Sequence, residues 1–152
     1  SVDREYSAIV YGHMIAGGAV DEPIGRDPKD RVKQAVLMSG KKATTHYRAI
    51  DRFKSHTHVK AILETGRTHQ IRVHLSHVGH SLIGDPMYGG RVRFPKKASE
   101  ELKDALVNFT RQALHSKKLT LTHPISGEIM SWKAPLPDDM IGLLDALKKF
   151  DS

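Results

Sequence analysis

The sequence predicts an α+β fold, in which a mixed, mainly antiparallel sheet carries a few packing helices. Three observations lead to this prediction. Segments with alternating apolar residues fill the first 64 positions, which is typical of strands. Two later segments, residues 99–109 and 137–150, space their apolar residues three and four apart, as amphipathic helices do. With 152 residues, 39% of them hydrophobic, the chain has the size and composition of one globular domain or part of one.

The first strand is predicted at residues 4–12. Tyr6, Ala8 and Val10 fall on one face, and Ser7, Ile9 and Tyr11 on the other. Because both faces carry apolar side chains, we predict an interior strand. Only a few residues precede this strand in the sequence, too few to cover one of its sides. We therefore expect an unpaired edge near residues 6–10 and self-association through it.

Further strands are predicted at residues 19–24, 33–38, 43–53 and 59–64. The last two are expected to pair, with Tyr47 and Leu63 among their inward residues. His46, Arg48 and Arg52 lie on the opposite face of residues 43–53. We therefore expect the sheet to have one wet, basic face.

A short helix is predicted within residues 64–88, ETGRTHQIRVHLSHVGHSLIGDPMY. The hydroxyl of Thr68 is expected to cap its start, and Gly79 to end it. Ile71, Leu75 and Val78 fall at spacings that place them on one apolar face.

Arg72 is the unusual residue of this helix, because it lies between Ile71 and Val73 beside the apolar face. A guanidinium in that position loses water and requires an anionic partner. The alternative is a surface arginine whose head group reaches solvent past the apolar residues.

The last third of the chain predicts two helices and a hairpin. Residues 91–97 form a basic loop, after which Ser99 can cap a helix with the apolar residues Leu102, Ala105, Leu106 and Phe109. Residues 118–123 and 128–133 are expected to form the hairpin, with Trp132 in the core. The last helix is predicted to start near Pro137, since acidic residues follow it and Lys148 and Lys149 lie in the final turn.

Positive charge is concentrated in the middle of the chain. Residues 29–97 hold 15 Lys and Arg against 4 Asp and Glu, a net +11, whereas the remainder holds 9 and 13, a net −4. This distribution indicates a polyanion-binding surface, and the alternative is an unevenly charged solvated surface.

The chain has no cysteine, which excludes disulfides, thiolate catalysis and cysteine-based zinc sites. Without an apolar run of membrane-spanning length or a signal-peptide pattern, we expect a cytoplasmic protein.

The run of residues 64–75 (ETGRTHQIRVHL), followed by Gly79 and by residues 84–89 (GDPMYG), resembles the third motif of the RluA-type RNA pseudouridine synthases. Residues 4–12 (REYSAIVYG) resemble the family's tyrosine-bearing strand, and residues 111–115 (RQALH) and 123–127 (HPISG) resemble its later signatures. Residues 13–23 and 94–96 are most similar to the large-subunit ribosomal RNA pseudouridine synthase D subgroup. The resemblance covers essentially the whole chain, but only the second half of the family's catalytic domain.

The resemblance implies an isomerase that converts uridine to pseudouridine in 23S ribosomal RNA of the large subunit. The reaction breaks the N1 glycosidic bond and joins C5 to the ribose without a redox change, so no cofactor is expected. Arg72 matches the basic residue that pairs with the catalytic aspartate. Tyr6 matches the tyrosine that stacks on the target uracil and is a candidate to remove the C5 proton. The alternatives are a structural ion pair for Arg72 and a sheet-face tyrosine for Tyr6.

The family's nucleophilic aspartate lies in a His-Arg-Leu-Asp motif ahead of the tyrosine strand, and this motif does not occur here. Asp85 instead matches a structural turn of the family. We therefore expect residues 1–152 to be the C-terminal part of a catalytic domain, to lack its N-terminal half and any RNA-binding domain, and to be inactive alone.

The resemblance and the positive charge together predict direct RNA contacts. The candidates are Arg67, His69, Gln70, Lys41, Lys42, Arg91, Arg93, Lys96 and Lys97. An RNA-binding module without catalysis is one alternative function. A metal hydrolase using His69, His74, His77 and His80 is another, but their spacing does not form the paired ligands of a zinc-protease helix, so we predict no metal site.

Overall fold

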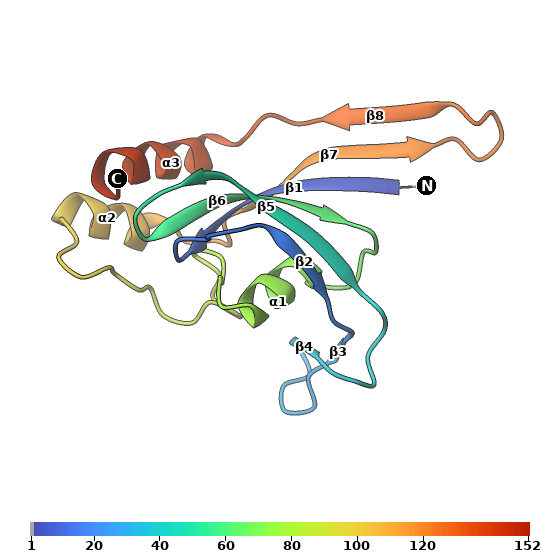
Figure 1. Ribbon diagram of the computed structural model, residues 1–152, viewed down its shortest axis with the longest axis horizontal. Helices are drawn as coiled ribbons and strands as arrows, with labels where there is room; N and C mark the ends of the chain where they lie inside the picture. The colour runs from blue at the N-terminus through green and yellow to red at the C-terminus, as the bar shows by residue number, and fades with distance from the viewer. Residues whose placement is uncertain (1) are drawn as a thin grey trace.

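The computed structural model describes residues 2–152 and arranges them around one six-stranded sheet (Figure 1). The order across the sheet is β2-β5-β6-β1-β7-β8, and all of these neighbouring pairs are antiparallel. The strands are β1 (Val2–Tyr11), β2 (Gly18–Asp21), β5 (Thr44–Arg52), β6 (His56–Leu63), β7 (Leu114–Thr122) and β8 (Ile129–Lys133). A separate two-stranded ribbon joins β3 (Ile24–Arg26) and β4 (Gln34–Val36). The predicted α+β class is confirmed.

Helices cover both faces of the centre of the sheet (Figure 1). Helix α1 (Gln70–His77) packs on the face that carries Ala8 and Val10 of β1. Helices α2 (Glu100–Asn108) and α3 (Asp138–Phe150) pack on the face that carries Ile9 and Tyr11. The expected wet, basic face is therefore wrong for the sheet as a whole. It is limited to β5, where His46, Arg48 and Arg52 are exposed.

Strand β1 is an interior strand, as predicted, but it has no open edge in the predicted region. Residues 4–11 pair with β6 on one side, and residues 2–8 pair with β7 on the other. The expected unpaired edge near residues 6–10 is wrong, because β7 comes from the far end of the chain to occupy it. Among the described residues, the outer strands of the sheet are β2 and β8.

Several locally specified features are confirmed. The hydroxyl of Ser99 accepts a hydrogen bond from the backbone N–H of Leu102 at 3.1 Å and caps α2. Pro137 is the N-cap of α3, and Lys148 and Lys149 lie in its last turn. The hairpin β7–β8 forms around residues 123–128 and extends along β1, away from α2 and α3 (Figure 1).

Two assignments to the core are wrong. Trp132 is 51% exposed, because β8 is an outer strand and the structure packs no helix on it. Val78 is 37% exposed, because α1 ends at His77 and the chain turns at Gly79. The buried side chains of α1 are instead Gln70, Ile71, Val73, His74 and Leu75.

Candidate active site

Arg72 and Asp85 form a buried ion pair beside α1. The guanidinium of Arg72 donates from Nε to Oδ2 of Asp85 at 2.8 Å and from Nη2 to Oδ1 at 2.9 Å. The Asp85 side chain is fully buried, and that of Arg72 is 11% exposed. Arg72 therefore has the anionic partner that its sequence position requires. The partner is Asp85 of the same chain. The sequence analysis placed this residue in a structural turn and did not pair it with Arg72.

Asp85 also holds the turn that it belongs to. Its Oδ1 accepts hydrogen bonds from the backbone N–H groups of Met87 at 2.9 Å and Tyr88 at 3.2 Å. Burial by itself would raise the pKa of Asp85, but the hydrogen bonds from Arg72 and from these two backbone groups outweigh it and lower the pKa. Asp85 is therefore ionised at neutral pH, with its charge matched by Arg72.

Tyr88 fixes Arg72 from another direction. The guanidinium carbon lies 5.0 Å from the centroid of the Tyr88 ring. The Tyr88 hydroxyl lies 2.8 Å from Nδ1 of His69 and accepts a hydrogen bond from the backbone N–H of Gln34 at 2.8 Å. Burial raises the pKa of Tyr88, so the hydroxyl keeps its proton and can donate it to His69. A carboxylate and an aromatic ring thus hold Arg72 in one orientation before any ligand arrives.

Helix α1 begins at Gln70 with His69 as its N-cap residue, so the prediction that Thr68 caps it is wrong. His69 is the N-cap residue and lies in the left-handed region at φ 55 and ψ 23, without a side-chain cap. This conformation is unfavourable for a residue other than glycine, and the hydrogen bond from Tyr88 helps to hold it.

Gln70 connects α1 to the sheet with four hydrogen bonds. Its Oε1 accepts from the Thr65 hydroxyl at 2.8 Å and from the Arg67 backbone N–H at 3.0 Å. Its Nε2 donates to the Thr44 carbonyl at 2.9 Å and to the Thr45 hydroxyl at 3.0 Å. These bonds use both donors and both acceptor sites of the buried amide. The Gln70 side chain therefore serves the fold, and its RNA contact stays a prediction.

A cavity of about 250 Å³ brings Tyr6 of β1 and Arg72 of α1 into one site. Its wall combines cationic, polar and apolar side chains. The lining residues are Arg4, Tyr6, Leu63, Gly66, Arg67, His69, Gln70, Ile71, Arg72, Gln112 and Leu114. No described carboxylate lies in this wall, so its charge favours an anion. The tyrosine and the apolar side chains offer a surface for a flat ring beside that anion.

Arg72, which lines the cavity, retains hydrogen-bonding capacity. Asp85 occupies Nε and Nη2, and Nη1 has no hydrogen-bond partner among residues 2–152 as described. An arginine can bind carboxylates along more than one edge of its guanidinium. The geometry therefore allows Arg72 to bind a second anion while Asp85 holds it from behind.

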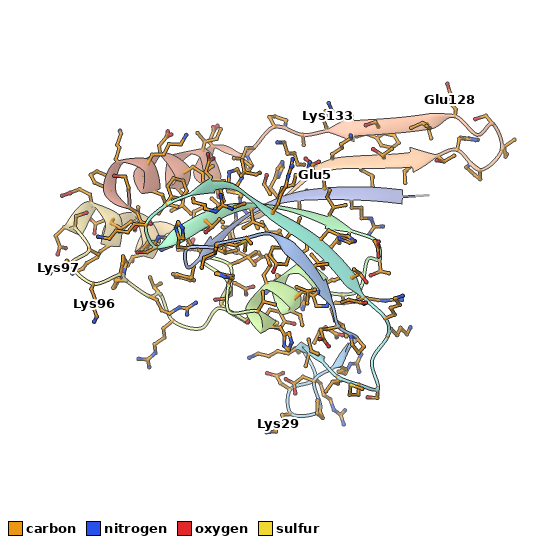
Figure 2. All side chains as sticks on the ribbon, in the orientation of Figure 1. Glu5, Lys29, Lys96, Lys97, Glu128 and Lys133 are labelled. Carbon is orange, nitrogen blue, oxygen red and sulfur yellow. The ribbon has the colours of Figure 1, made fainter. Side chains whose placement is uncertain are left out.

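The remaining RNA-contact candidates form two groups. Arg67 donates from Nε to the Lys42 carbonyl at 2.9 Å, and Arg67, Lys41 and Arg26 line a neighbouring depression. The second group lies on the loop before α2 and consists of Arg91, Arg93, Lys96 and Lys97. Figure 2 shows the Lys96 and Lys97 side chains projecting outward from this loop. The structure thus places both groups where a polyanion can reach them, and contact with RNA stays a prediction.

Sequence reasoning missed several residues of the site. Arg4 and Gln112 line the cavity, while Asp85 and Tyr88 position Arg72. A signal for Asp85 existed in the Gly-Asp-Pro run. Gly84 has φ 78, and a side chain there would meet the carbonyl oxygens of Arg111 and Phe109. A glycine required at that point indicates a tightly packed turn, in which an aspartate is buried and needs a partner.

Three of the four histidines of residues 69–80, namely His69, His74 and His80, make separate hydrogen bonds. His74 lies between the Thr45 hydroxyl at 2.8 Å and the Glu22 carbonyl at 2.9 Å. His80 meets the Tyr11 carbonyl through Nδ1 at 2.9 Å. Within the part of the chain that the structure describes, no three His, Cys, Asp or Glu residues are grouped so that they could hold a metal ion. The geometry gives a metal-dependent hydrolase no support.

A model of the RNA pseudouridylate synthase family matches residues 1–77. This chain belongs to that family. The match begins ahead of Tyr6 and ends at the last residue of α1, so it includes both Tyr6 and Arg72 of the cavity.

The chain is also similar to ribosomal large subunit pseudouridine synthase D from several bacteria. It is 54% identical to that of Escherichia coli (strain K12) over 147 residues, 55% identical to that of Pasteurella multocida (strain Pm70) over 147, and 53% identical to that of Pseudomonas aeruginosa over 149. These matches cover 97–98% of this chain, which spans 45–47% of the length of those relatives.

Solved structures from the pseudouridylate synthase family have the same fold. Human RNA Pseudouridylate Synthase Domain Containing 4 superposes with a TM-score of 0.72 at 26% identity and covers 97% of this chain and 62% of its own. Human RNA Pseudouridylate Synthase Domain Containing 1 superposes with a TM-score of 0.70 at 22% identity, and at that identity the likeness concerns the fold alone.

Proposed function

We propose that this chain provides the arginine and tyrosine side of the active site of an RNA pseudouridine synthase acting on uridines of 23S ribosomal RNA. One observation carries the proposal. Tyr6 and a pre-oriented Arg72 line a single cationic cavity, in a chain that belongs to this family. The large-subunit RNA as substrate is supported by the relatives that are 53–55% identical.

Each residue has a defined role in the proposed reaction. A nucleophilic carboxylate attacks the ribose carbon C1′ or the uracil ring, and Nη1 of Arg72 holds that carboxylate ionised and oriented. The N1–C1′ bond breaks, and the freed uracil turns while Tyr6 supports its face. C5 then bonds to C1′, the carboxylate is released from the carbon that it had attacked, the Tyr6 hydroxyl relays the proton that leaves C5, and N1 takes up a proton. Asp85 keeps Arg72 in position throughout.

We propose that the chain is inactive by itself, because the cavity wall contains no described carboxylate that could act as the nucleophile. Asp85 does not fill this role, since its side chain is fully buried and both of its oxygens are bonded to Arg72. The nucleophile would come from a part of the enzyme beyond these residues.

Tritium release from RNA labelled at C5 of uridine tests both statements. The chain alone should release none above background. A longer protein that contains this chain and supplies the aspartate should release tritium, and Arg72→Gln in it should reduce the rate by about 10²-fold or more. Release by the chain alone would refute its proposed inactivity, and an unaffected Arg72→Gln enzyme would refute the role of Arg72.

RNA binding without catalysis is the alternative function, and the two basic groups of residues favour it. Binding by the chain should then weaken steeply with salt.

None of the helices in the described part of the chain has the length and apolar composition that a membrane span requires. A cytoplasmic location stays a prediction, as does self-association, for which the outer strands β2 and β8 replace β1 as the candidate edges.

A further inference from the structure

We propose a second RNA subsite, a pocket that binds one nucleotide through its base and phosphate away from the catalytic cavity. It lies between the end of β1, the turn joining β5 to β6 and the loop before α2. The proposal deepens the RNA-binding part of the proposed function and rests on it. The pocket has a volume of about 310 Å³ and is lined by Tyr11, Ser55, His56, Arg93, Phe94, Pro95 and Lys96.

Arg93 is held rigidly at the edge of this pocket. Its guanidinium carbon lies 4.3 Å from the centroid of the Tyr11 ring, and its Nη2 donates to the Ser81 hydroxyl at 2.6 Å. Its Nε and Nη1 have no hydrogen-bond partner in the described part of the chain. An arginine fixed in this way loses little conformational freedom when it binds a phosphate, and it presents paired donors that match phosphate oxygens.

His56 supplies a fixed polar group inside the pocket. Its Nδ1 lies 2.8 Å from Oδ2 of Asp151, and the two side chains are 1% and 2% exposed. Because a carboxylate accepts, Nδ1 carries the hydrogen, and Nε2 is left without a partner among the described residues. The His56 side chain is thus almost wholly enclosed and forms a fixed part of the pocket wall.

Phe94 and Lys96 complete a surface that matches a nucleotide. Phe94 is 44% exposed beside Arg93 and adds an aromatic face to the pocket wall. Exposed aromatic rings next to cations are the usual platform for unpaired bases. Lys96 is exposed on the same rim and adds a charge for the backbone phosphate.

The position of the pocket suits one RNA molecule that also enters the cavity. Tyr6 lines the cavity and Tyr11 lines the pocket, and both belong to β1, but their side chains point to opposite faces of the sheet. At about 3.3 Å per strand residue they are about 17 Å apart along β1, so an RNA that enters both sites must pass around the sheet. Arg91 and Arg93 also line a third depression, together with Tyr88. A structured RNA spans such a distance, whereas a free nucleotide occupies one site only.

The test measures binding of this chain to a fluorescently labelled uridine-containing RNA hairpin, as a function of salt, by anisotropy. Phe94→Ala should weaken binding about tenfold through lost stacking. Lys96→Ala should reduce the slope of log affinity against log salt by about 0.7–0.9, the contribution of one phosphate contact. Lys133→Ala is the matched control, because it removes the same charge from the distant β7–β8 hairpin (Figure 2) and should leave that slope nearly unchanged. Thermal unfolding of each variant confirms that it folds.

The outcomes separate this subsite from the proposed function. The unchanged chain is expected to bind the hairpin. If the Phe94→Ala and Lys96→Ala variants bind the hairpin as tightly as the unchanged chain and with the same salt slope, the subsite is refuted while the cavity proposal stands. If the three variants weaken binding equally, the effect is only general charge or stability, and the subsite is again refuted. If the two pocket variants alone lose affinity but Arg72→Gln leaves tritium release by the longer enzyme intact, the subsite stands and the proposed role of the cavity fails.

Discussion

Arg72 and Asp85 lie thirteen positions apart in the sequence and meet through two parallel hydrogen bonds, one to each carboxylate oxygen. The pair joins α1 to the turn that follows it, and Tyr88 of that turn lies against the same guanidinium. The structure therefore positions the proposed catalytic arginine through a turn that shows no catalytic signature in the sequence.

The first prediction concerns the stability provided by this pair. Asp85→Asn should lower the free energy of unfolding by about 3 kcal/mol, because it leaves a buried guanidinium without a countercharge. The matched control is Asp139→Asn, which breaks an equally bidentate pair with Arg111 at 2.7 and 2.9 Å. The side chains of Arg111 and Asp139 are 41% and 47% exposed, so the loss of this pair should change the free energy of unfolding by less than about 1 kcal/mol. Urea denaturation measures both variants, and equal losses would show that burial of the Arg72 pair is irrelevant.

The second prediction concerns the left-handed conformation of His69. His69→Gly and His69→Ala both remove the hydrogen bond to Tyr88, but only glycine tolerates φ 55 without strain. The glycine variant should be more stable than the alanine variant by about 1 kcal/mol in urea denaturation. The same pair of substitutions at His77, the last residue of α1, should give the opposite order, because alanine is the better helix former. An alanine variant at position 69 as stable as the glycine variant would contradict the assigned conformation.

The third prediction is a loss of stability in mild acid. Burial lowers the pKa of His74 and that of His58 below the ordinary value of 6.5. The unfolded chain therefore takes up these protons at a higher pH than the folded chain. The stability is fully present above about pH 6.5 and declines as the pH falls below it toward the lowered folded-state pKa values.

His74 is bonded in a way that protonation would break. Thr45 donates its hydroxyl hydrogen to Nδ1 of His74, because Nε2 of His74 donates to the Glu22 carbonyl. A proton on Nδ1 would remove the acceptor of this bond, so the Thr45 hydroxyl would have to rotate and accept from Nδ1 instead. Urea midpoints measured between pH 7.5 and 5.5 should fall less in His74→Gln than in the unchanged chain, and His58→Gln gives the separate contribution of His58. A midpoint independent of pH in the unchanged chain would contradict the prediction.

The fourth prediction separates the two roles proposed for Tyr6. In a longer enzyme that supplies the aspartate, Tyr6→Phe keeps the ring that supports uracil and removes the hydroxyl. It should keep RNA affinity and lower tritium release from C5 by about 10²-fold or more. Tyr6→Leu should lose both, because the flat surface is gone as well. Full activity of the phenylalanine variant would leave Tyr6 with the stacking role alone.

The features that the sequence predicted well depend on neighbouring residues. Ser99 caps α2 and Pro137 precedes α3 because a cap needs only the first turn of its own helix. The failures depend on contacts between distant segments. Thr68 was a plausible cap, but the bonds of Gln70 to β5 and of His69 to Tyr88 start the helix one residue later. The partner of Arg72 was missed for the same reason, since a bidentate pair across thirteen residues leaves no periodic pattern.

The pairing of β1 with β7 has a consequence for how the chain reaches this fold. β1 (Val2–Tyr11) leaves the ribosome well before its neighbour β7, which begins at Leu114. Throughout the intervening synthesis, one side of β1 has open backbone groups and can bind wrong strands. Contacts this distant in sequence also slow folding in a test tube. We expect the chain to need protection by a chaperone while it is being made, even though its finished sheet leaves β1 fully enclosed.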